Sequence, residues 1–154
     1  MKEQKYLCAY CCGRIDKEKS HNEHIEPRNP KHGTSKRSLD YSNMVASCYG
    51  FRGEHTCGSH KGNDYDERKF ISPLNPECED VFQYLPNGKI EGDTYTINLL
   101  NLNSYKLRKA REAVYKTLLG MDEQTIQLVY NGDEDQLTPF INVIRWYLKQ
   151  SSNQ

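Results

Sequence analysis

The sequence predicts an α+β fold: a small, cysteine-containing front part with short strands, then a β-hairpin, then a helical back half. Three observations lead to this prediction. Paired cysteines bracket short extended segments before residue 60, a Pro-Asn-Gly turn separates two apolar pairs near residue 87, and apolar residues recur with helical spacing after residue 94. We therefore divide the chain into a front unit, residues 1–69, and a hairpin and helical unit, residues 70–154.

Length and composition indicate one domain with a modest core. The chain has 154 residues, of which 36% are apolar, so some other source of stability is expected. Lysine plus arginine and aspartate plus glutamate balance at 21 each, but unevenly along the chain. Residues 1–63 hold 11 basic and 7 acidic side chains (+4), and residues 64–154 hold 10 and 14 (−4). A basic front half fits a polyanionic partner.

The chain shows no sign of a membrane or secreted protein. No run approaches the roughly 20 apolar residues of a membrane span, and the first residues lack the apolar stretch of a signal peptide. We therefore expect a cytoplasmic protein that does not enter a membrane. Disulfides are rare in that compartment, so the six cysteines are interpreted as metal ligands or free thiols.

In the front unit, turns and short extended segments alternate. Residues 6–15 predict two short strands around a tight knuckle, and residues 23–26 a short extended segment ending at Pro27. A turn around Asn43 should lead into the apolar residues 44–46, and a helical turn should begin at Cys57.

In the back unit, the signals are stronger. Residues 81–90 predict a hairpin because Pro-Asn-Gly supplies the positive φ of the turn. A short helical segment is expected over 94–102. Three helices should follow: from Ser104 to near Gly120, from Asp122 to Asn131 and Gly132, and from Thr138 and Pro139 to about Lys149.

Four cysteines predict a structural zinc site. Cys8 and Cys11 have the C-x-x-C spacing of half a tetrahedral site, and Cys48 and Cys57 form a looser second pair with eight residues between them. Cys12 is an alternative to Cys11, and only one of the two is expected to bind. A set of buried free thiols is the alternative interpretation of all four. Cys78 stands alone and is interpreted as a spare thiol.

Together, the motifs CAYC, EHIEP, YSNMVASC and CGSHKGN resemble those of HNH nucleases, over roughly residues 8–63. The resemblance implies a zinc-stabilised ββα-metal core that hydrolyses phosphodiesters with a divalent metal ion. It also implies that the catalytic residues are His24, as the base, and Asn43, which orients it. Glu23 would then be the acidic metal ligand.

At the second metal ligand, the chain departs from the family pattern. Many members have asparagine or histidine directly after the last cysteine, where this chain has Gly58. The expected substitute is His60, with Asn63 next and His55 after that. His21 is interpreted as a surface or substrate-side residue.

A wider pattern, over about residues 8–119, resembles the PtuB-type nucleases of Septu anti-phage systems and related retron systems. It consists of CG-x-x-KGN, I-x-P, F-Q-Y-x-x-x-G-K-I, TINLLNLN and a basic helix. This resemblance implies an ATPase partner of the ABC/SMC type, and residues 70–154 would be the docking and packing extension.

The expected chemistry is hydrolysis of DNA, or alternatively RNA, by one base and one metal ion. Imidazole can take a proton from water near neutral pH, and a hard ion suits phosphate, so Mg²⁺ or Mn²⁺ is expected beside the structural Zn²⁺. Candidate phosphate contacts lie in basic loops: Arg28, Lys36, Arg37 and Lys61. Two alternatives remain: a non-catalytic zinc-ribbon module that binds nucleic acid, and a toxin-like HNH domain that needs no partner.

Overall fold

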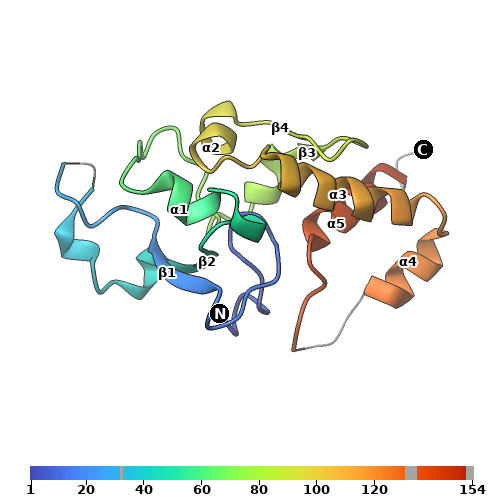
Figure 1. The fold of residues 1–154 in the computed structure, drawn as a ribbon, viewed down its shortest axis with the longest axis horizontal. Helices are drawn as coiled ribbons and strands as arrows, with labels where there is room; N and C mark the ends of the chain where they lie inside the picture. The colour runs from blue at the N-terminus through green and yellow to red at the C-terminus, as the bar shows by residue number, and fades with distance from the viewer. Residues whose placement is uncertain (32, 131–134, 152–154) are drawn as a thin grey trace.

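The computed structural model describes residues 1–31, 33–130 and 135–151. It is a mixed helix and strand structure, which confirms the α+β class. Strands and turns of the front part occupy one end of the molecule. The other end is formed by three helices, α3 (Tyr105–Leu118), α4 (Glu123–Tyr130) and α5 (Ile141–Ser151) (Figure 1). Short 3₁₀ turns connect the elements, at Ser35–Arg37, Tyr41–Asn43, Phe51–Gly53 and Cys78–Val81.

The front part consists of two antiparallel strands followed by a short helix. Strand β1 (Ser20–His24) pairs with β2 (Met44–Cys48), with Glu23 opposite Val45. Helix α1 (Cys57–Lys61) packs against β2. The extended segment expected over residues 23–26 is thus displaced: the strand begins at Ser20 and ends at His24. The helical turn expected at Cys57 is confirmed.

The knuckle at residues 6–15 is held by backbone hydrogen bonds rather than by two regular strands. Leu7 and Arg14 form an isolated antiparallel bridge. The amide of Cys8 donates to the carbonyl of Gly13 at 2.9 Å, and the amide of Cys12 donates to the carbonyl of Cys8 at 3.0 Å. These bonds close the loop tightly enough to bring Cys8 and Cys11 to the same side.

The back part matches the predicted hairpin and helices closely. Strands β3 (Gln83–Tyr84) and β4 (Ile90–Glu91) form the hairpin, and Gly88 at its turn has a φ of +76°. The helices are α2 (Thr94–Leu99), α3 (Tyr105–Leu118), α4 (Glu123–Tyr130) and α5 (Ile141–Ser151).

The predicted helix ends are only partly reproduced. Asp122 caps α4 as expected, since its carboxylate accepts from the amide of Thr125 at 2.8 Å. Ser104 precedes α3, but its side chain makes no capping hydrogen bond. Helix α5 begins at Ile141, later than the Thr138-Pro139 signal. The predicted end of α4 at Asn131 and Gly132 lies outside the described residues.

One core cluster joins both parts of the chain. It contains Cys8 and Val45 from the front and Leu107 and Val143 from the back, all buried. The amide of Phe140, just before α5, donates to the carbonyl of Cys12 at 2.8 Å. The back half is therefore packed directly onto the knuckle. The division at residue 69 stays a prediction.

No helix in the described part of the chain is both long and apolar enough to cross a membrane.

Arg111 of α3 is a buried cation that ties the hairpin to the helices. It is 1% exposed, its Nε donates to the carbonyl of Gly88, and its Nη2 donates to the carbonyl of Leu102, both at 2.7 Å. Burial lowers the pKa of this guanidinium to about 10. We expect Arg111→Ala to reduce the free energy of unfolding by about 3–5 kcal/mol, because it leaves a cavity and two carbonyls without donors.

Urea unfolding measures this effect. The matched control is Lys109→Ala on the same helix, because the exposed ammonium of Lys109 pairs, among the described residues, only with Glu112. Lys109→Ala should change stability little. Equal unfolding midpoints for the two variants would contradict the structural role of Arg111.

Candidate functional site

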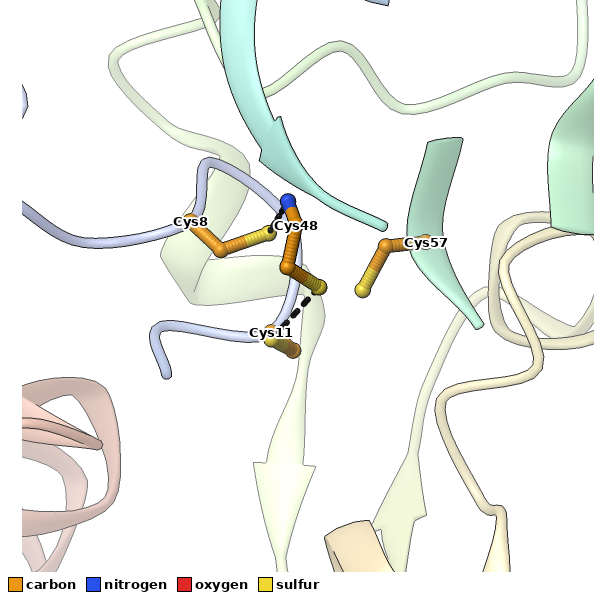
Figure 2. Close-up of side chains that lie close together, drawn as sticks. All are labelled: Cys8, Cys11, Cys48 and Cys57. Carbon is orange, nitrogen blue, oxygen red and sulfur yellow. Dashed lines mark hydrogen bonds between the residues drawn. The ribbon is translucent and has the colours of Figure 1, made fainter. Parts of the chain in front are cut away.

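The four predicted cysteines converge on one buried point. The sulfur atoms of Cys8, Cys11, Cys48 and Cys57 all lie within 4.8 Å of one another (Figure 2). Two come from the knuckle, one from the end of β2 and one from the start of α1. The cluster therefore joins three segments far apart in sequence.

The donor set and its spacing fit a tetrahedral zinc ion. Zn–S bonds of about 2.3 Å place the sulfurs of a regular tetrahedron roughly 3.8 Å apart, and the Sγ atoms of Cys11 and Cys48 are 4.0 Å apart. Backbone amides already point at the sulfurs: those of Gly13 and Cys48 donate to Cys11 and Cys8, each at 3.4 Å.

The remaining cysteines lie outside this cluster. Of the two neighbours in the knuckle, the structure selects Cys11, while Cys12 contacts the other apolar cluster, around Leu118. Cys78 is half-buried and also apart from it. Hydrogen bonds with Cys48 and Cys57 raise the pKa of the Cys11 thiol, so a metal ion binding there would displace its proton.

A cleft of about 670 Å³ opens beside β1 and the loop that follows it. Its lining includes His21, Glu23 and His24 of β1, together with Arg28 and Asn63. The cleft brings the predicted base and the predicted acidic ligand to one surface. It is the candidate functional site.

Glu23 lies at the inner wall of the cleft and is only 7% exposed. Its Oε1 accepts from Nζ of Lys61 at 2.9 Å and from the hydroxyl of Tyr10 at 3.4 Å. Its Oε2 lies 3.4 Å from Nε2 of His21. Burial works against ionisation of Glu23, but the hydrogen bond with His21 and the charge of Lys61 outweigh it and lower the pKa of the carboxyl.

Lys61 is the buried counter-ion of Glu23. Its side chain is 0% exposed, and Nζ also donates to the carbonyl of His24 at 3.0 Å. Removing one partner of a buried pair leaves the other charge uncompensated. We expect Lys61→Met to lower the free energy of unfolding by about 3–5 kcal/mol.

Thermal and urea unfolding check this prediction. Lys89→Met is the matched control, because Lys89 forms an exposed pair with Glu91, two residues further along the same arm of the hairpin. A Lys61→Met protein as stable as the control would show that the buried pair contributes nothing.

His24 is half-buried at the end of β1, and its hydrogen bond defines its chemistry. Its Nε2 lies 2.9 Å from the carbonyl oxygen of Ser38. A carbonyl only accepts, so Nε2 carries the proton and Nδ1 carries the lone pair. This is the tautomer that a general base requires.

Asn43 holds the segment that positions His24. Asn43 is only 1% exposed. Its Oδ1 accepts from the amide of Glu26 at 2.8 Å, and its Nδ2 donates to the carbonyl of Glu26 at 3.0 Å. Nδ2 also reaches the carbonyl of Arg37 at 3.4 Å, next to Ser38. Asn43 thus ties the residues after His24 to the carbonyl that His24 binds.

The three sequence candidates for a second metal ligand are placed differently. His60 is exposed; its Nδ1 lies 2.8 Å from the carbonyl of Leu99, and its ring lies 5.3 Å from that of His55. No described contact brings His60 or His55 to Glu23. Asn63 does line the cleft.

The candidate phosphate contacts also fall into two groups. Arg28 and Lys36 are exposed, and Arg28 lines the cleft. Arg37 is held by Asp40 at 2.9 Å and Glu26 at 3.3 Å, and Lys61 is buried against Glu23. Among the described residues, therefore, Arg37 and Lys61 have carboxylate partners, and Arg28 and Lys36 have none.

Two residues differ from their interpretation in the sequence. His21, expected to be a surface or substrate-side residue, lies beside Glu23, and Lys61, expected to contact phosphate, is buried. The signal for His21 was its spacing: residues two apart in a strand face the same side, so His21 and Glu23 lie together. Lys61 follows Cys57 by four residues, which places it on the same buried face of α1.

The chain was compared with known proteins. A protein of Escherichia coli named "Retron Ec83 putative HNH endonuclease" is 30% identical over 156 aligned residues, which cover 71% of this chain and 60% of that relative. The chain thus spans 60% of the relative's length. No protein-family model matches the chain.

Proposed function

We propose that this protein is an HNH-type endonuclease that hydrolyses phosphodiester bonds of DNA with the help of a divalent metal ion. The observation that carries the proposal is His24, oriented through Nε2 by a backbone carbonyl and adjacent in sequence to the carboxylate of Glu23 at the same cleft. The strand–strand–helix order of β1, β2 and α1 and the printed name of the relative support it.

The chain's own residues account for activation of the water. Nδ1 of His24 takes a proton from a water molecule in the cleft, and the hydroxide that forms attacks phosphorus. The carbonyl of Ser38 accepts from Nε2–H throughout and stabilises the imidazolium that results. The bond from phosphorus to the leaving oxygen breaks, and that oxygen receives a proton from solvent.

Glu23 would hold the divalent ion through Oε2, because Lys61 already occupies Oε1. Such an ion supplies Lewis-acid stabilisation of the charge that develops on the phosphate and the leaving oxygen. Arg28, exposed at the same cleft, would contact a phosphate of the bound strand. Carboxylate and water ligands favour Mg²⁺ or Mn²⁺.

The cysteine cluster would hold a separate, structural zinc ion. All four ligand positions of a tetrahedral ion are filled by thiolates, so no position remains for substrate. Its role in the proposal is to anchor β2 and α1, which carry the residues around Glu23.

We also propose that the nuclease acts in a bacterial anti-phage complex with an ATPase of the ABC/SMC type. This part rests on the PtuB-type sequence resemblance and on the word "Retron" in the relative's name. Co-purification with the product of a neighbouring ATPase gene tests it separately from the chemistry.

The decisive experiment is plasmid nicking by the purified chain, alone and with such a partner. Supercoiled DNA is incubated with Mg²⁺ or Mn²⁺, with and without EDTA, and an RNA substrate is run in parallel. Cleavage that needs the divalent ion supports the proposal. Binding of nucleic acid without cleavage under all these conditions would favour the non-catalytic zinc-ribbon module instead.

A further inference from the structure

We propose that His21, not His60, is the histidine that binds the catalytic divalent ion together with Glu23. The inference rests on the proposed metal-dependent function and assigns the second ligand of the same site. It is carried by the position of two donor atoms, by the space next to them, and by the contacts that hold each ring.

The two donor atoms have the separation expected of neighbouring ligands on one ion. Ligand bonds of about 2.0–2.2 Å at angles of about 90–110° place adjacent donors roughly 2.8–3.6 Å apart. Nε2 of His21 and Oε2 of Glu23 are 3.4 Å apart. Both residues line the cleft, so an ion bound between them would be reached from solvent and could keep water or a phosphate oxygen as further ligands.

Gly58 makes room for this arrangement. A Cβ atom at residue 58 would lie 2.9 Å from Nε2 of His21 and 2.7 Å from Oε2 of Glu23. Any side chain there would therefore displace one of the two donors. Gly58 at the start of α1 therefore leaves free the space that His21 of β1 and Glu23 occupy.

The ring of His21 packs against the ring of Tyr49. Their centroids are 5.0 Å apart with the planes at 31°. Nδ1 of His21 is buried and has no hydrogen-bond partner in the described part of the chain. Without an ion, Nε2 of His21 donates its proton to Oε2 of Glu23; an ion bound at Nε2 would take the place of that proton, and the neutral ring would then carry its proton on Nδ1.

Lys61 fixes the orientation of the Glu23 carboxylate. It binds Oε1 of Glu23 and leaves Oε2 facing His21. A hydrogen bond to the oxygen that does not bind the ion fixes the orientation of the oxygen that does. His60, by contrast, is exposed and its Nδ1 lies against the carbonyl of Leu99.

The test measures Mn²⁺ binding directly, by the loss of the free-ion electron paramagnetic resonance signal, in full-length protein whose zinc content has been confirmed. His21→Ala should weaken Mn²⁺ binding roughly tenfold or more, since the loss of even an outer partner of a ligand costs that much. His60→Ala, a histidine substitution on the adjacent helix, should leave the affinity unchanged.

His21→Gln separates a ligand from a merely structural residue. Glutamine can still donate a hydrogen bond to Glu23 but is a weak ligand, so it too should lose Mn²⁺ affinity while the unfolding temperature stays near that of wild type. Wild-type affinity in His21→Gln or His21→Ala, or a loss confined to His60→Ala, would overturn the inference. If the wild-type chain meanwhile cuts DNA only with a divalent ion, the proposed function stands without it.

Discussion

Replacing His24 with alanine is expected to reduce the rate of divalent-ion-dependent DNA nicking by roughly 10²–10⁴-fold, the usual contribution of a general base. The reason is specific to the geometry: the carbonyl of Ser38 fixes the proton on Nε2, so Nδ1 is the only lone pair that the ring offers. Alanine removes the proton acceptor but leaves Glu23 and its partners in place.

The same variant should fold normally, because the side chain of His24 is only half-buried and makes one described hydrogen bond. Zinc content and circular dichroism verify this. His55→Ala serves as the matched histidine substitution, since His55 is exposed and its ring contacts His60 rather than the cleft. Nicking by His24→Ala at the wild-type rate would rule out the mechanism.

Replacing Cys57 with serine should have the largest effect on stability. Structural zinc supplies an apparent free energy of about 10–16 kcal/mol in small domains, which is as large as the total stability of about 5–15 kcal/mol of a typical protein. Cys57 is 0% exposed and joins the start of α1 to the cluster. We expect Cys57→Ser to lose bound zinc and its cooperative unfolding transition, and chelation of wild-type protein to do the same.

Cys78→Ser provides the control for this prediction. Cys78 is also partly buried, but its sulfur lies outside the cluster, near the carbonyl of Pro73. This variant should keep one zinc per chain, measured by elemental analysis, and nearly the wild-type unfolding midpoint. A Cys57→Ser protein that retains both would mean that the four thiols do not hold a structural ion.

Local signals were sufficient for several parts of the fold. The Pro-Asn-Gly turn predicted the hairpin because Gly88 adopts the positive φ that the turn needs. Leu107 and Leu118 are eleven residues apart, about three helical turns, so they share one face of α3, and both are 0% exposed. These features depend on residues close in sequence, so their pattern is visible without the tertiary structure.

The candidate site was only partly predictable, because helix α1 has five residues and no readable period. Its rotation is set by Cys57, whose sulfur points into the cluster (Figure 2). That rotation turns Gly58 and Lys61 inward, toward Glu23, and leaves His60 outside. A sequence motif that places all of 57–63 near the site does not specify which side chains face it.

By itself, the sequence determined the chemical inventory: four cysteines able to converge, a histidine beside a glutamate, and an asparagine before the second strand. The tertiary structure alone decided which neighbours these groups meet. Glu23 is bound by Lys61 and faces His21, because strand pairing puts residues two apart on one side and the cysteine cluster orients α1. The contact of Lys61 with Glu23 joins segments 38 residues apart, and spacing within either segment does not reveal that the two segments meet.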